Sequence, residues 1–246
     1  MRFIIHEQPY EKPIMAGEYR YERDGRPTGA VETWRLTAAA EGYHFLRVDL
    51  DAREAASGHT YLYHALVGPG GFVERLQYRF WTQASGGLQV TGDVVLEGDA
   101  LSAARTVNGK AFEQVLELPT GCRFWFPSAA GLHFAGWGEG EPKTAVSTSS
   151  RQAVSTSSRL AVTLNGAVGG EDTLAVQAVD FEYALLSVDY LEMAAAGKVR
   201  RYSPWKLSWG DGQWRIIQRD AENGWPLGME RQDGLTAVAS QYIHYI

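Results

Sequence analysis

The alternation of side chains between residues 42 and 96 constrains the fold more than any other feature of the chain. The stretch contains four strand-like runs, separated by clusters of Gly, Ser and Pro. Within each run apolar residues recur at every second position, and a period of two sends neighbouring side chains to opposite faces of a strand. One apolar face beside one mixed face is typical of an antiparallel sheet buried on one side. The first run places His44, Leu46, Val48 and Leu50 on one face and Tyr43, Phe45, Arg47 and Asp49 on the other.

Two dipeptides predict tight hairpins on either side of this stretch. Asp24-Gly25 follows the run GEYRYER, and Asn108-Gly109 joins two later runs. Asp-Gly and Asn-Gly favour two-residue hairpin turns because both central residues of such a turn take positive φ. After the first turn, the run GAVETWRL places one set of alternate residues on a common face: Ala30, Glu32, Trp34 and Leu36.

These patterns predict an all-β fold with minor α content. Strand-like runs recur about every 8–12 residues with turns between them, which indicates a sandwich or barrel-like sheet. We predict one large curved antiparallel sheet, a half-barrel or open barrel, that forms a single β domain over residues 1–246. The run DFEYALLSVDYLEM fits either a strand or a helix.

Residues 138–159 differ from the rest of the chain. They contain the sequence AVSTSSR twice, starting at Ala145 and at Ala153, and are dominated by Ser and Thr. A single duplication does not make a repeat fold, because repeat architectures need about three copies to bury a shared core. We expect a polar, duplicated surface loop; the sharper alternative is a mobile lid or a docking segment.

Composition and charge exclude several classes of function. A net charge of −6 argues against nucleic-acid binding, whose affinity comes mainly from neutralising phosphates. We expect no membrane span, because no window approaches about 20 apolar residues. The start of the chain lacks the run of about 7–15 apolar residues of a secretory signal. We therefore expect a cytoplasmic protein, or a periplasmic one if the chain is a mature form; its oligomeric state is left open.

Catalytic and metal-binding motifs are weak, and we expect neither a cofactor nor a metal. The single cysteine, Cys122, excludes an internal disulfide and a Cys-rich zinc site. The histidines lack metal-ligand spacing, and His59 and His64 should point to opposite faces of a strand. Asp49 and Asp51 share a strand face, where a cation or an acid–base pair is one reading and a solvated strand end the other.

The segment 198–206, KVRRYSPWK, combines four cations with two aromatic residues. Such a segment suits phosphates, anionic lipid headgroups or an acidic partner. It is more often typical of a solvated edge strand that resists aggregation.

Aromatic residues are the most informative feature for function. Eight Trp and twelve Tyr exceed what an aliphatic core needs, so one sheet face must either bind a ligand or be covered. The other reading is that the two halves of the sheet cover each other. The candidate ligand-binding positions are Tyr43, Phe45, Tyr61, Tyr63, Phe72, Tyr78 and Phe80.

The opening hairpin GEYRYERDGRPTGAVETWRL and the late segment NGWPLGMERQDGLTAVASQY resemble the half-barrel families of bacterial lipoprotein carriers and related uncharacterised envelope proteins. The resemblance implies a long curved antiparallel sheet around an apolar cavity. It covers most of the chain as a pattern and assigns no functional residue. The absence of an export signal departs from those families.

Three functions arise as hypotheses. The first is a non-catalytic protein that binds a lipid or another apolar ligand in the concave sheet, since such sites are concave and mainly apolar. The second is a structural or protein-interaction module that uses a sheet face or the basic edge at 198–206. The third is an enzyme acting on carbohydrates, which requires two carboxylates, or a histidine and a nucleophile, in one pocket. Size measurement in solution separates the first two, because stable self-association through a sheet edge would favour the second. Whether the sheet's interior is filled or open is the observation that bears most on the first.

Overall fold

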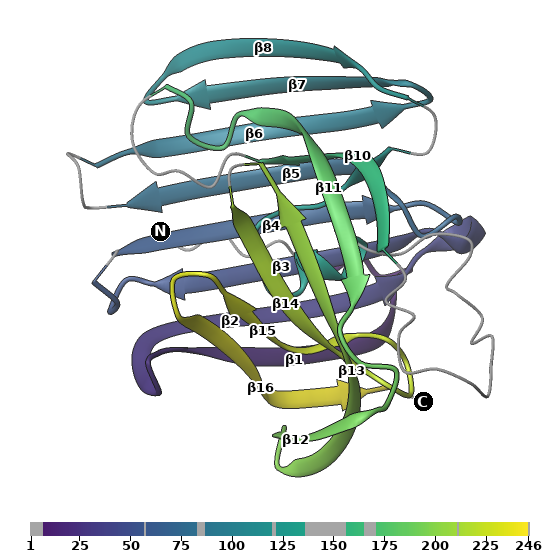
Figure 1. Cartoon of the computed structure of the whole chain (residues 1–246). Helices are drawn as coiled ribbons and strands as arrows, with labels where there is room; N and C mark the ends of the chain where they lie inside the picture. Colours follow the sequence, from purple (N-terminus) through teal and green to yellow (C-terminus); the bar gives the residue numbers. More distant parts are fainter. Residues whose placement is uncertain are drawn as a thin grey trace.

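A computed structural model of the chain describes residues 7–56, 58–82, 87–119, 122–135, 156–164, 171–210 and 212–245. One large sheet of sixteen strands runs through these residues (Figure 1). Its order is β8-β7-β6-β5-β4-β3-β2-β1-β16-β15-β14-β13-β11-β10-β9, and β12 pairs with β13 beside this path. The predicted all-β class and the curved, unclosed antiparallel sheet are confirmed.

The first half of the sheet is a meander of neighbouring strands. It comprises β1 (Lys12–Arg23), β2 (Arg26–Ala38), β3 (His44–Ala52), β4 (His59–Val67), β5 (Val73–Thr82), β6 (Gln89–Glu97), β7 (Ala100–Val107) and β8 (Lys110–Glu117). The second half comprises β9 (Arg123–Phe124), β10 (Thr156–Leu164), β11 (Val176–Leu185), β12 (Leu191–Ala195), β13 (Lys198–Trp209), β14 (Gln213–Asp220), β15 (Pro226–Arg231) and β16 (Leu235–His244). Two short 3-10 helices, η1 (Ala40–Gly42) and η3 (Gly131–Ala135), complete the described elements.

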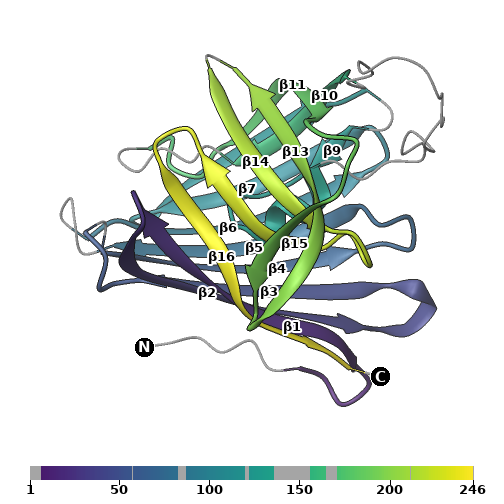
Figure 2. The same cartoon turned by 60° about the horizontal axis from the view of Figure 1, so that its bottom comes forward.

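The sheet curves so that its second half crosses over its first. Strands β10, β11, β13 and β14 pass steeply across β3 to β6 in Figure 1, and Figure 2 shows β16, β15, β14 and β13 leading up to that crossing. Strand β16 lies beside β1 in antiparallel register, from Met15 opposite His244 to Arg23 opposite Leu235. The two ends of the described chain are therefore joined in the middle of the sheet, and its concave side becomes an interior.

Both predicted hairpins are present. Asp24 and Gly25 take φ values of 52° and 72° between β1 and β2, and Asn108 and Gly109 take 46° and 84° between β7 and β8. Two successive positive φ values suit the right-handed twist of the flanking strands. The ambiguous run from Asp180 is strand at its start, because it continues β11.

The buried faces of β1 to β6 follow the predicted alternation, except at the start of β5. Leu46, Val48 and Leu50 of β3 are buried, whereas Phe45 and Arg47, which alternate with them, are partly exposed. The exception is Val73: an odd spacing from Leu76, Tyr78 and Phe80 in FVERLQYRFW predicts the outer face, but Val73 is buried on the inner face. A register shift between Leu66 and Val67 pairs Val67 with Val73, and one extra residue in a strand reverses the facing of the residues beyond it.

Two predictions about surface segments are wrong in part. Residues 156–159 of the expected loop 138–159 begin β10 and pair with β11, because Ser and Thr fit a strand when a partner offers hydrogen bonds; residues 138–155 lie outside the described part of the chain. The basic segment 198–206 is a sheet edge only at its start: residues 202–206 pair with β14, whereas residues 198–200 pair with β12 alone. Strand β13 pairs with β14 on one side and with β11 and β12 on the other.

Neither described 3-10 helix, one of three and one of five residues, has the length or apolar character of a membrane-crossing helix.

Candidate functional site

The seven aromatic residues proposed to bind a ligand do not share one face. Four of them, Tyr61, Tyr63, Tyr78 and Phe80, lie on the inner face of β4 and β5 and are buried. Phe45 lies on the outer face of β3, where its ring is 5.2 Å from that of His64. Tyr43 precedes β3 and is only partly buried. Its carbonyl accepts a hydrogen bond from the Ala39 N–H group across η1. Strand alternation alone separates Tyr43 and Phe45 from the interior.

The four inner rings pack against protein. Tyr63 lies 4.8 Å from the ring of Phe126, and Tyr61 lies 4.7 Å from that of Phe80. The Tyr78 hydroxyl donates a hydrogen bond to the Leu174 carbonyl at 2.8 Å. Because Tyr63 is fully buried and Tyr78 and Phe80 are each 2% exposed, these rings form part of a packed core in this structure.

The seventh residue, Phe72, also touches the segment that fills the interior. Its ring lies under the Arg123 guanidinium, 3.6 Å from the ring centre, which is a close cation–π contact. Arg123 belongs to β9, which pairs with β10 over only two residues. Phe72 therefore lies where the first half of the sheet meets this segment.

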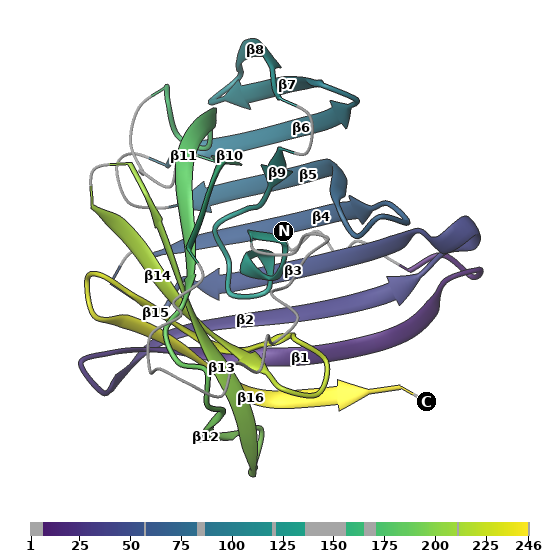
Figure 3. The ribbon, with the colours of Figure 1, turned by 45° about the vertical axis from the view of Figure 1, so that its right-hand side comes forward.

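Residues 122–135 form what we call the interior segment. It runs from β9 into η3 and lies between the two halves of the curved sheet (Figure 3). Its large side chains are buried: Phe124, Trp125, Phe126, Leu132 and Phe134. The interior of the sheet is thus filled largely by this connecting segment, with Thr173 and Leu174 beside it, and the alternation pattern did not predict either.

Glu32 fixes the interior segment to the sheet. Its side chain points inward from β2 and is fully buried. The backbone N–H groups of Ala129 and Ala130 donate to its two carboxylate oxygens at 3.0 and 2.8 Å, and the Tyr21 hydroxyl donates a further short hydrogen bond. Burial raises the pKa of Glu32, while these hydrogen bonds favour the ionised form and oppose that shift.

Aromatic stacking holds the other end of the segment. The His133 ring stacks on Trp225 at 4.3 Å, and Trp225 stacks on Trp34 at 4.4 Å. Burial and the nearby Arg219 lower the pKa of His133, so the ring is neutral near pH 7. Arg219 also donates to the His133 carbonyl at 3.1 Å. Sequence reasoning missed both Glu32 and His133 as interior groups. The available signal was Glu32, a carboxylate on the apolar face of GAVETWRL.

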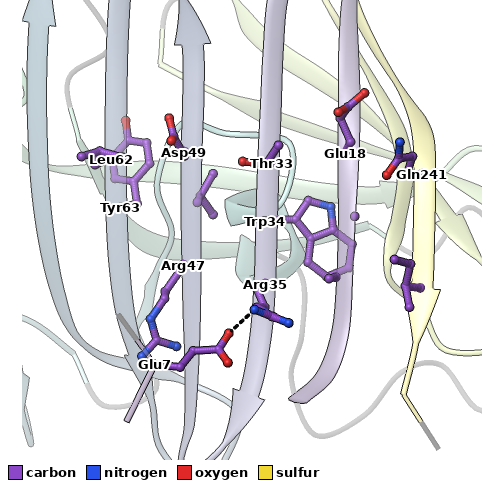
Figure 4. A pocket seen from close by; sticks show the side chains of 14 residues that line it. Glu7, Glu18, Thr33, Trp34, Arg35, Arg47, Asp49, Leu62, Tyr63 and Gln241 are labelled. Carbon is purple, nitrogen blue, oxygen red and sulfur yellow. Dashed lines mark ion pairs between the residues drawn. The ribbon is translucent and has the colours of Figure 1, made fainter. Parts of the chain in front are cut away.

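A hollow of about 380 Å³ lies on the outer face of β1 to β4 (Figure 4). Charged side chains surround it, and Glu7 forms an ion pair with Arg35 at 2.7 Å beside Arg47. Two carboxylates, Glu18 and Asp49, flank Thr33 on adjacent strands. Glu18 is already bonded to Arg20 and to the Ser240 hydroxyl. The hollow offers groups of both charges to a small polar molecule.

The other candidate chemical groups are dispersed. Cys122 is buried, and burial raises the pKa of its thiol, which disfavours the reactive thiolate. His59 and His64 lie on opposite faces of β4, as predicted, and burial lowers the pKa of His64 to about 4. Asp51 forms an ion pair with Arg53. Within the described residues, no three His, Cys, Asp or Glu side chains are grouped to hold a metal ion.

Sheet order, curvature and a filled interior define an open, barrel-like β protein. No family model and no curated protein matches the chain. A similar solved structure is the crystal structure of a β-barrel-like protein of a domain of unknown function, DUF1849, from Brucella abortus. The likeness covers 96% of this chain and 98% of that one, with a TM-score of 0.55 and 13% identity. It supports the barrel-like fold implied by the resemblance to lipoprotein carriers, and it extends to the fold alone.

Proposed function

We propose that the protein is a non-catalytic binding protein that takes up a lipid or another apolar ligand in the interior of its curved sheet. The observation that carries the proposal is the way in which this interior is filled. Aromatic rings line it, and the interior segment, residues 122–135, occupies it together with buried Thr173 and Leu174, whose carbonyls accept hydrogen bonds from Arg105 and Tyr78. A ligand that replaced the rings of Phe126 and Phe134 would meet the same apolar surroundings.

The attachment of the interior segment suits such an exchange. The segment pairs with the sheet over two residues of β9, whereas β1 pairs with each of its neighbours along most of its length. Its polar attachments include the hydrogen bonds to Glu32, the Arg219 bond to His133 and a hydrogen bond between His133 and the Gly224 backbone. Segments held by few backbone hydrogen bonds open at lower free energy than paired strands.

Binding of a neutral apolar dye, N-phenyl-1-naphthylamine, tests the proposal. We expect saturable binding near one dye per chain. Glu32→Gln should bind the dye more tightly, because the amide offers a donor where Ala129 or Ala130 needs an acceptor, and a more weakly held interior segment is displaced more easily. The matched control is Glu113→Gln, on the exposed face of β8. Near-ultraviolet circular dichroism must show that each variant keeps its packed Trp residues. A folded Glu32→Gln variant that takes up no dye would overturn the proposal.

An interaction module is the second candidate, and an exposed apolar surface favours it. The large exposed side chains of this surface lie before and within the β12–β13 hairpin: Leu186, Val188, Tyr190, Leu191 and Val199. The Tyr190 ring contacts Arg201, which shares a strand face with Val199, so the surface is continuous. Sedimentation of the wild type and of Val188→Asp with Val199→Asp tests it. Self-association that the two aspartates abolish would favour this function.

A further inference from the structure

Two arginines lie directly opposite each other on the inner face of the sheet. Arg215 of β14 pairs in register with Arg231 of β15, two residues beyond the core pair Ile217 and Met229. Strand alternation places all four side chains on the same face. Like charges directly opposite each other on a sheet are unfavourable, so this pair needs a compensating partner.

The ion pair available within the described residues is made by Arg231, although the charge of Asp233 also acts favourably on Arg215. Asp233 forms ion pairs with Arg231 and with Arg23 of β1, the latter at 3.1 Å. Arg215 instead donates to two neutral acceptors, the Trp214 carbonyl at 2.7 Å and the Gln232 amide oxygen. Its guanidinium lies 5.1 Å from the Trp209 ring centre. Burial and the nearby Arg231 lower the pKa of Arg215 to about 10.

The hydrogen bonds of two other inward-facing arginines end on the backbone of distant segments. Arg105 donates to the carbonyls of Glu171 and Thr173, and Arg219 donates to the His133 carbonyl. Both therefore fix backbone that covers the interior. Arg215 is the third residue of β14 and Arg231 is the last residue of β15, with a side chain one-third exposed, so this pair borders the rim of the interior. Tyr61 lies close enough to Arg231 for that charge to act on its hydroxyl.

We propose that Arg215 and Arg231 form a binding site for an oxyanion, a carboxylate or a phosphate group, at the rim of the curved sheet. Guanidinium groups bind both oxyanions through paired, charge-assisted hydrogen bonds. This proposal rests on the proposed function: the oxyanion is the headgroup of an amphiphile whose apolar chain enters the interior. Free inorganic phosphate shares the same chemistry and is distinguished below.

Two fluorescent probes separate the headgroup from the chain: 11-(dansylamino)undecanoic acid and its methyl ester. We expect the wild type to bind the acid at least tenfold more tightly than the ester. Arg215→Gln should weaken the acid about tenfold and leave the ester unchanged, because only the acid has a charge for the guanidinium. The matched control, Arg20→Gln, removes an exposed arginine of the outer face and should change neither affinity.

Equal binding of acid and ester by the wild type would overturn the headgroup site while leaving the proposed function intact. If neither probe binds, the proposed function fails, and the oxyanion site is tested with inorganic phosphate. The measurement is the Tm of the wild type and of Arg215→Gln in phosphate and in chloride at equal ionic strength. A rise in Tm specific to phosphate that Arg215→Gln abolishes supports a site for free oxyanions. No such rise at tens of millimolar phosphate would overturn the oxyanion site.

Discussion

Replacing Glu32 by Ala should detach the interior segment from the sheet. The variant removes the acceptor of the Ala129 and Ala130 N–H groups and of the Tyr21 hydroxyl, all of which are buried. Each buried, unsatisfied donor costs about 1–3 kcal/mol. Relief from burying a carboxylate offsets part of this loss, because burial already raises the pKa of Glu32. We expect the free energy of unfolding to fall by about 3 kcal/mol.

Urea unfolding followed by Trp fluorescence measures this change. Trp225 stacks on His133 of the interior segment, so its emission reports docking of the segment. Glu32→Gln should lose less than Glu32→Ala, since its amide oxygen still accepts one of the two N–H groups. Glu113→Gln on exposed β8 should change stability by less than about 0.5 kcal/mol. A loss below about 1 kcal/mol for Glu32→Ala would refute the anchoring role of the carboxylate.

The pH dependence of the unfolding free energy is an independent test of the state of the Glu32 carboxyl. A carboxyl whose folded pKa is raised binds more protons in the native than in the unfolded state between 4.5 and the folded value. Its ionisation therefore lowers stability as pH rises through that window. The difference in unfolding free energy between wild type and Glu32→Gln should be more favourable to the wild type at pH 4.5 than at pH 8. A difference that moves in the opposite direction would show that the hydrogen bonds outweigh burial.

Three further predictions rest on other contacts. Arg47 and Thr37 hold the pKa of buried Glu11 at about 2 against desolvation, so its stabilisation is complete above pH 4.5 and is lost as pH falls toward 2; Glu11→Gln should cost about 2 kcal/mol at pH 7 and less at pH 3 in urea titrations. Gly92→Ala should lower stability by about 1–3 kcal/mol, since its Cβ would overlap the Tyr78 ring; a stability equal to the wild type would contradict this. Arg215→Met should raise the free energy of unfolding by about 1 kcal/mol without added anion, because relief of desolvation and repulsion exceeds two lost hydrogen bonds; a destabilised variant would contradict it.

Local rules account for the strands and turns that sequence reasoning predicted. Alternation assigned Leu46, Val48 and Leu50 to the buried face because a period of two is a property of the strand backbone itself. The turns at Asp24-Gly25 and Asn108-Gly109 followed from backbone φ preferences of the same kind. Neither inference needs to know which segment lies opposite the strand.

Features that depend on distant parts of the chain were beyond these rules. The register shift beside Leu66 turns the side chain of Val73 to the inner face. An inserted residue of this kind cannot be detected from alternation before the partner strand is known. The basic segment 198–206 resembles an edge by composition, yet β11, β12 and β14 flank β13. The filling of the interior depends on residues 122–135, whose Gly, Pro and aromatic residues carry no period.

Charged residues at inward-facing positions were the one sequence signal that pointed to those distant contacts. Burying a charge on an apolar face is costly unless hydrogen bonds compensate it. The structure supplies such bonds from segments outside the strands: Glu32 accepts from Ala129 and Ala130, and Arg105 donates to Thr173. Arg215 occupies an equivalent inward position, yet its described hydrogen bonds end on neutral groups at the rim. If each inward charge marks a place where something covers the interior, the partner still to be supplied at Arg215 is an anionic ligand.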